Sequence, residues 1–326
     1  MAAKPDRRDE CLEDREIFRK NAAKLIEEMV FLSEDTEEDT TPLVDEVLHS
    51  IFFLGRVYDP QFSPEGIEID QEMREFLEDS YPEAFRLYSS RLPHRAPFSC
   101  VLDMIVHIAG QENEEEVKNQ LQQFVQQLEG DQPKHLLSTT MCISQINSPD
   151  SGRHYGVSMS TFGRVAGKIM VAASCLQTWH QLVAGAVLSY DQRFKKKMPL
   201  RSNFNGTIRL PQNIRCEAYN IRDQTLKHPC SSCGDLFGLN NTEEKRWRYG
   251  NCAEVESVSK LLKTEAQVTE QVEFQAEWTA ESRKQVEDEV RKELEGWLRM
   301  KGFRWDGQFY VPQSIQPLEE NDFEFN

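Results

Sequence analysis

Apolar residues recur at helical spacing through the first 130 positions of the chain. Residues 9–32 place apolar side chains such as Phe18 and Met29 near one face of a helix. An acidic break, "SEDTEEDTT", separates this segment from four further stretches with the same periodicity, and Gly130 stands where the last helix would end. The pattern predicts a mostly helical N-terminal domain over residues 1–130.

The periodicity changes after Lys134 from helical to alternating. The stretches "HLLSTTMCISQI" and "RHYGVSMSTF" are rich in β-branched and aromatic residues, and they flank the turn-forming cluster "NSPDSG". They predict a β-hairpin over residues 136–146 and 153–161. Residues 214–221 alternate in the same way, so we expect them to form a strand that pairs with the hairpin.

Three more patterns complete the second half of the chain. The nearly uncharged residues 164–190 predict one long buried helix, and the charged residues 267–301 predict another long helix. The stretch "GFRWDGQFYVP" predicts a short C-terminal hairpin. The order of these elements predicts an α/β (α+β) domain over residues 131–326, with a mixed sheet and flanking helices, behind the helical domain.

Composition and charge narrow the class of protein. The 326 residues are 39% hydrophobic and carry a net charge of −17, which favours a soluble globular protein and works against indiscriminate binding to nucleic acid. The first residues are charged, and no apolar run approaches the roughly 18–20 residues of a membrane span. We therefore expect a cytoplasmic protein without membrane association, whose eight cysteines are reduced and serve as packing residues, metal ligands or reactive thiols.

Three of these cysteines fall within the stretch "HPCSSCGDLFGLNNTEEKRWRYGNCAEVESVSKLL". Cys230 and Cys233 are one helical turn apart after a proline that suits a helix start, and Cys252 begins a second helix pattern with Glu254 two positions later. Zinc held by three protein ligands keeps an open position for catalysis, whereas four ligands close the site and make it structural. His228 is the candidate for a fourth ligand.

The two motifs "PCSSC" and "CAE" resemble the signature of the zinc-dependent cytidine and nucleic-acid deaminase superfamily, although their order along this chain is reversed. The resemblance implies that Cys230, Cys233 and Cys252 bind Zn²⁺, which lowers the pKa of a bound water toward ~7. It further implies that Glu254 carries protons. The reaction would then be hydrolytic deamination of cytosine or adenine, in a nucleotide or in a single-stranded nucleic acid.

The segment around the motifs is basic although the chain is acidic. Residues 193–248 contain 12 basic and five acidic residues, and aromatic residues are interleaved with them. Trp247 and Tyr249 are the candidates for stacking on a base of the substrate. The alternative is that this basic segment docks on the acidic N-terminal helices.

Several other interpretations of the same residues stay open. The chain can be a non-catalytic intracellular interaction protein in which a structural zinc holds the fold, with a protein as its partner. The cysteines can also form a buried trio without metal, or Cys230 and Cys233 a redox pair. Glu254 can be a favourable charge at the start of a helix. Elsewhere, we expect His154 to be a surface residue of a strand and His180 to be a hydrogen-bonded core residue.

Overall fold

The first part of the chain folds into a helical bundle. The computed structural model describes residues 7–128, 135–148, 151–161, 163–190, 204–242, 244–275 and 279–313. The helices of the bundle are α1 (Arg7–Glu34), α2 (Thr41–Val57), α3 (Gln71–Ser80), α4 (Pro82–Leu87), α5 (Pro97–Ala109) and α6 (Glu114–Leu128), with a 3-10 turn, η1 (Pro64–Gly66), before α3. The predicted helical N-terminal region is confirmed, while its predicted end at residue 130 lies outside the described ranges.

A small antiparallel sheet forms the centre of the second half. It consists of β1 (Thr140–Ile146), β2 (His154–Val157), β4 (Ile214–Asn220) and β5 (Leu226–Lys227), in the order β2-β1-β4-β5. Met141 of β1 pairs with Val157 on one side and with Tyr219 on the other. The predicted hairpin and its pairing with the strand near residue 214 are therefore confirmed. A second pair joins β3 (Ile208–Arg209) to β6 (Glu273–Phe274).

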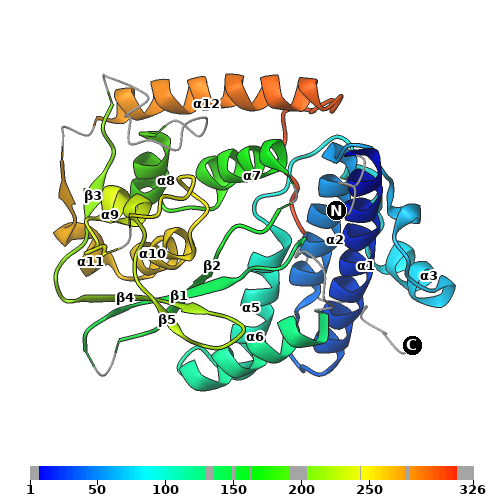
Figure 1. Cartoon of the computed structure of the whole chain (residues 1–326), viewed down its shortest axis with the longest axis horizontal. Coiled ribbons are helices and arrows are strands. Elements are labelled where there is room, and N and C mark those ends of the chain that lie inside the picture. Colours follow the sequence, from blue (N-terminus) through cyan, green and yellow to red (C-terminus); the bar gives the residue numbers. More distant parts are fainter. Residues whose placement is uncertain are drawn as a thin grey trace, which may run out of the picture.

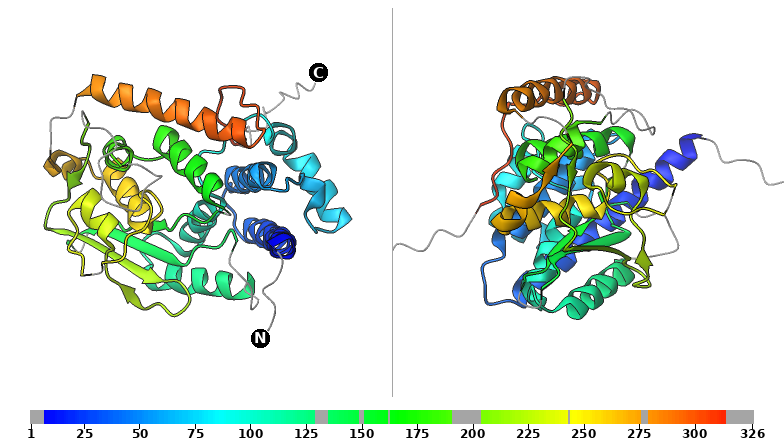
Figure 2. Two further views of the ribbon diagram at one scale, coloured as in Figure 1. Left: turned by 45° about the horizontal axis from the view of Figure 1, so that its top comes forward. Right: turned by 90° about the vertical axis from the view of Figure 1, so that its left-hand side faces the viewer.

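Helices cover both faces of the four-stranded sheet (Figures 1 and 2). Helix α10 (Ala253–Thr264) lies on one face, where Ser257 Oγ is 2.9 Å from Ser144 Oγ of β1. Helix α6 lies on the other face, with Lys118 Nζ 4.8 Å from the centre of the Tyr219 ring. One hydrophobic cluster extends from Phe18 to Tyr310, so bundle and sheet share a core. The predicted combination of helices and strands is confirmed, but the predicted mixed sheet is wrong, because every strand pair of this sheet is antiparallel.

The remaining helices surround α10 and the sheet. The outermost is α12, which lies across α7 and α8 along the upper edge of the molecule in Figure 1. Their bounds are α7 (Arg164–Gln177), α8 (Gln181–Leu188), α9 (Ser231–Phe237), α11 (Ala266–Gln271) and α12 (Ala280–Met300).

The apolar segment 164–190, predicted as one helix, is two. Helix α7 ends at Gln177 and α8 begins at Gln181, because His180 leaves the helical conformation and its Nδ1 accepts a hydrogen bond from Leu182 N at 3.3 Å. The Thr178 hydroxyl, which donates to the carbonyl of His94 at 2.9 Å, also fixes this break. His180 is thus a half-buried helix cap and not a core residue. No helix in the described ranges is long and apolar enough to cross a membrane.

The C-terminal predictions also need correction. The helix predicted over 267–301 is interrupted, because the chain leaves α11 to pair β6 with β3, and the Thr279 hydroxyl then caps α12 by accepting from Ser282 N at 3.1 Å. The stretch predicted as a hairpin instead runs alongside a remote residue, since Tyr310 N donates to the carbonyl of Leu92 at 2.8 Å. Long-range pairing decides both outcomes.

A bidentate ion pair joins the basic segment to the helical bundle. Arg215 of β4 donates from Nη1 and Nη2 to the two carboxylate oxygens of Glu114 in α6, at 2.7 and 2.9 Å. The hydrogen bonds from Arg215 are the largest of the effects that lower the pKa of Glu114 to about 2. This residue of the basic segment therefore docks on an acidic N-terminal helix, as the alternative interpretation expected.

We expect the variant Glu114→Gln to be less stable than the wild type by about 1–3 kcal/mol at pH 7. The folded-state pKa lies below the ordinary value of 4.5, so the stabilisation is present above pH 4.5 and is lost as the pH falls toward 2. Urea unfolding at a series of pH values measures the difference. Glu116→Gln removes another first-turn charge of α6 and is the control. If both variants lost the same free energy of unfolding at every pH, the stabilisation could not be assigned to the ion pair between Glu114 and Arg215.

Candidate metal centre

Three thiols converge in the structure. Cys230 Sγ lies 3.7 Å from Cys233 Sγ and 3.5 Å from Cys252 Sγ, and all three sulfurs lie within 4.8 Å of one another. Three sulfurs bound to a tetrahedral ion at ~2.3 Å would lie about 3.8 Å apart. The observed spacing fits such an ion, so the predicted convergence of these cysteines is confirmed.

Two helix starts bring the three cysteines together. Cys230 is the residue before α9 and Cys233 lies in its first turn, while Cys252 is the extended residue that precedes α10. The loop before α10 is tied to the end of the hairpin, because Met159 N donates to the carbonyl of Asn251 at 2.9 Å. Gly250 turns the chain into this loop with a φ of +91°, and a Cβ there would lie 2.6 Å from Val171.

The three thiols shift one another's pKa values. Contact with the thiols of Cys233 and Cys252 lowers the pKa of Cys230 far below its ordinary value. The same contacts and burial raise the pKa of Cys233 and Cys252. A divalent, thiophilic cation among the three sulfurs would stabilise all three as thiolates, so the set suits an ion of this kind.

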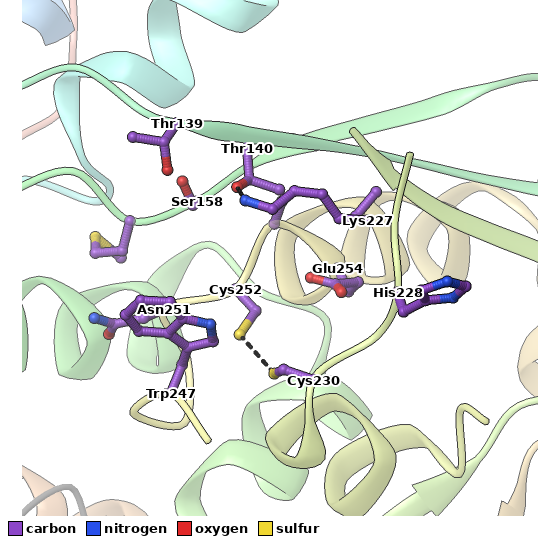
Figure 3. A pocket seen from close by; sticks show the side chains of 13 residues that line it. Thr139, Thr140, Ser158, Lys227, His228, Cys230, Trp247, Asn251, Cys252 and Glu254 are labelled. Atoms are coloured by element: carbon purple, nitrogen blue, oxygen red, sulfur yellow. Dashed lines mark hydrogen bonds between the residues drawn. The ribbon is translucent and has the colours of Figure 1, made fainter. Parts of the chain in front are cut away.

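Glu254 lies in the first turn of α10, beside the sulfurs, and its side chain is 5% exposed. Burial is the largest of the effects that raise its pKa, and the charge of Cys230 adds to it. A pocket of about 200 Å³ is lined by Glu254 together with Cys230 and Cys252 (Figure 3). The carboxyl and the thiols therefore reach the same space.

The opposite wall of the pocket is polar. Lys227 Nζ donates to Thr140 Oγ1 at 2.8 Å, and both side chains line the pocket. Lys227 and Thr140 were not among the candidate site residues, although Lys227 lies two positions before the "PCSSC" motif. The full lining comprises Thr139, Thr140, Ser158, Met159, Ala218, Lys227, His228, Cys230, Trp247, Asn251, Cys252, Ala253 and Glu254.

His228 and the two aromatic candidates occupy different places. The His228 ring points away from the sulfurs in Figure 3, and among described residues the group of converging ligand atoms consists of the three cysteines. Trp247 lines the pocket and is 49% exposed. Tyr249 is buried, stacks on Tyr190 at 4.0 Å and donates its hydroxyl proton to Asp235 at 2.9 Å. Of the two aromatic candidates, therefore, Trp247 lines the pocket and Tyr249 does not.

A chain of buried and half-buried charges connects α10 to the helical bundle. Glu256, two residues after Glu254, forms an ion pair with Lys260 at 3.0 Å, and Lys260 Nζ donates to Asp103 of α5 at 2.6 Å. Arg95 continues the chain of charges, since it pairs with Asp103 and, at 2.8 Å, with Glu46 of α2. The helical bundle thus anchors the helix that presents Cys252 and Glu254.

Glycine at position 156 allows α10 to touch the sheet. A Cβ on Gly156 would lie 2.3 Å from Ser257 N and 2.5 Å from the carbonyl oxygen of Ala253. Both atoms are backbone of α10, so no side-chain movement relieves the overlap. The neighbouring His154, expected on the surface, is buried, with Nε2 3.8 Å from a carboxylate oxygen of Glu265, because the end of α10 covers that strand.

The variant Gly156→Ala is expected to lose about 3 kcal/mol of stability, at the upper end of typical overpacking costs. It should also bind zinc more weakly, because a shifted α10 displaces Cys252. Thermal unfolding and competition with a metal chelator measure the two effects. Gly296→Ala in α12 is the control, since a Cβ there meets no atom within 4 Å. Wild-type zinc affinity in Gly156→Ala would show that the contact does not position the site.

No protein-family model, curated protein sequence or solved structure matches this chain. Any inference about function must therefore rest on the residues of the site.

Proposed function

We propose that this chain is a zinc-dependent hydrolase that removes the amino group from a nucleobase. The observation that carries the proposal is that Cys230, Cys252 and Glu254 line one pocket. A purely structural zinc site needs neither an accessible metal nor a carboxyl directed into the same space. The motifs that resemble the deaminase signature are thus close in space, as the chemistry requires, although their order along the chain is reversed.

Cys230, Cys233 and Cys252 would hold the ion, and two of them, Cys230 and Cys252, line the pocket. When bound, zinc lowers the pKa of a water ligand and so supplies a nucleophile near neutral pH. Glu254 takes a proton from the attacking water and gives a proton to the departing amine. Water supplies the oxygen of the new C–O bond at the ring carbon, the exocyclic bond between that carbon and its amino nitrogen breaks, and the nitrogen leaves as ammonia. The reaction therefore needs no oxidant or reductant.

The dimensions and lining of the pocket favour one small heterocycle. Its volume of about 200 Å³ is below the ~300–1,000 Å³ of pockets for drug-sized ligands. Thr139, Thr140, Ser158 and Asn251 provide hydroxyl and amide groups that can pair with ring nitrogens and exocyclic oxygens. Trp247 offers an aromatic face at the opening.

The test is release of ammonia by the full-length protein. Zinc-loaded protein and protein treated with a chelator are incubated with cytosine- and adenine-containing nucleosides, nucleotides and single-stranded oligonucleotides. We expect release from at least one of these classes, loss after chelation and recovery after zinc is returned. Protein that contains zinc but releases no ammonia from any of them would favour the non-catalytic interaction protein with a structural zinc.

A further inference from the structure

The segment that leads into the metal site alternates between exposed and inward-facing side chains. Lys245 and Trp247 are exposed, whereas Arg246 is half-buried, pairs with Asp235 and donates to the Tyr249 hydroxyl at 2.7 Å. Lys245 Nζ lies 4.1 Å from the centre of the Trp247 ring system. Because Trp247 both lines the pocket and is 49% exposed, the Lys245–Trp247 pair stands at the opening of the pocket.

Helix α9 holds this pair in place. Ser231 N donates to the carbonyl oxygen of Lys245 at 3.0 Å, and Ser232 Oγ donates to the carbonyl oxygen of Trp247 at 2.6 Å. Cys233 lies in the same helix and Cys230 directly precedes it, so the Lys245–Trp247 pair is bonded to the helix that carries two of the three candidate ligands. A large, half-exposed indole fixed by its backbone loses little conformational freedom when a ligand stacks on it.

The surroundings of the pair favour an anionic ligand. Lys227 and His228 line the pocket, His228 is exposed, and Arg248 follows Trp247 in the chain. Among the described residues that line the pocket, Glu254 is the one acidic residue, and it is buried beside the sulfurs. A ligand with a negatively charged phosphate backbone can therefore lie at the opening without repulsion from an exposed carboxylate of the pocket wall.

We infer that the Lys245–Trp247 pair binds a single-stranded nucleic acid next to the base that enters the pocket. A pocket of about 200 Å³ already accommodates the reacting base, and a free nucleotide has no second base to place on an outside platform. A single strand does have one: it stacks on Trp247, and Lys245 contacts the phosphate between the two bases. A duplex keeps its bases inside the stack, out of reach of the pocket. The inference rests on the proposed function for the identity of the buried base, but binding does not require turnover.

The test is fluorescence anisotropy of a labelled single-stranded 12-mer with the zinc-loaded full chain carrying Glu254→Gln. Trp247→Ala in this background should weaken binding by about 5- to 100-fold, and Trp247→Phe should retain most of it because a ring face remains. Lys245→Gln should weaken binding to all sequences to a similar extent and reduce the slope of log affinity against log salt concentration by about 0.7.

Two matched variants serve as controls. Phe76→Ala removes a similarly exposed aromatic ring from α3 (46% exposed), and Lys284→Gln removes an exposed charge from α12. Neither residue lines the pocket, so both variants should bind the 12-mer like the parent. A duplex of the same sequence and a mononucleotide should bind more weakly than the single strand.

The outcomes separate this inference from the proposed function. Binding that depends on Trp247, without ammonia release by the protein with Glu254 intact, supports the inference and rejects the proposed function. Deamination of mononucleotides, with no gain in affinity for the 12-mer, rejects the inference and supports the proposed function. Failure to bind the 12-mer, or equal binding after Trp247→Ala, also overturns the inference. Either result would favour contact of the exposed Trp247 indole with a protein partner instead.

Discussion

Replacement of Glu254 by glutamine is expected to leave about one zinc per chain and to lower the deamination rate by about 10²–10⁴-fold, the usual contribution of a general acid–base group. Glutamine has nearly the same shape as glutamate, so α10 and the cysteines should keep their places. It cannot accept and return a proton, which the attacking water and the departing amine both require. Metal analysis and the rate of ammonia release are measured on the same protein preparation.

Glu281→Gln is the control for the competing interpretation of Glu254 as a helix-terminal charge. Glu281 also lies in the first turn of a helix, α12, but it is exposed and far along the chain from the pocket. Loss of such a charge costs about 0.3–1 kcal/mol of stability and should leave the rate unchanged. Wild-type activity in Glu254→Gln, with zinc retained, would reduce Glu254 to the same structural role.

Replacement of Cys233 by alanine is expected to remove the metal, with zinc content falling from about one per chain to less than ~0.1, and to lower the melting temperature. Two remaining thiolates cannot complete a tetrahedral site, and the free energy of metal binding contributes to folding stability. A chelator should destabilise the wild type but not this variant. Metal analysis and thermal unfolding with and without chelator measure these effects.

Cys175→Ala separates loss of the metal from loss of a buried thiol. Cys175 lies in α7 and is 2% exposed, so its truncation removes packing of a similar kind without touching a ligand. This variant should keep its zinc and its response to chelator. A Cys233→Ala protein that still contains one zinc would show that the three sulfurs do not form the metal site. This result would contradict both the metal centre and the proposed reaction.

The helical N-terminal region, the hairpin and the strand 214–221 were predictable because short-range periodicity determines them. Apolar spacing over one helical turn, or alternation along a strand, decides which side of a segment is buried. The two cysteines of "PCSSC" belong to the same class of signal, since three positions along a helix start bring two side chains to one side. Their proximity to each other needed no knowledge of the rest of the fold.

The breaks at His180 and near β6 were not predictable in this way. Each depends on a partner far along the chain: the carbonyl of His94 for Thr178, and strand β3 for Phe274. Local patterns also failed to separate Trp247 from Tyr249. Both are aromatic residues in a basic segment, and only the fold buries Tyr249 against Tyr190 while leaving Trp247 at the pocket.

The sequence by itself determined the fold class, the main elements and the identity of the candidate ligands, because local periodicity and residue chemistry are contained in short stretches. Only the tertiary structure decided that Cys252 joins Cys230, that Glu254 faces the same pocket and that Lys227 and Thr140 form its opposite wall. These contacts arise when α10 packs against the sheet at Gly156 and is held by Asp103 through Lys260. They join residues separated by 22 to 157 positions, a range over which no periodic pattern in the chain specifies a contact.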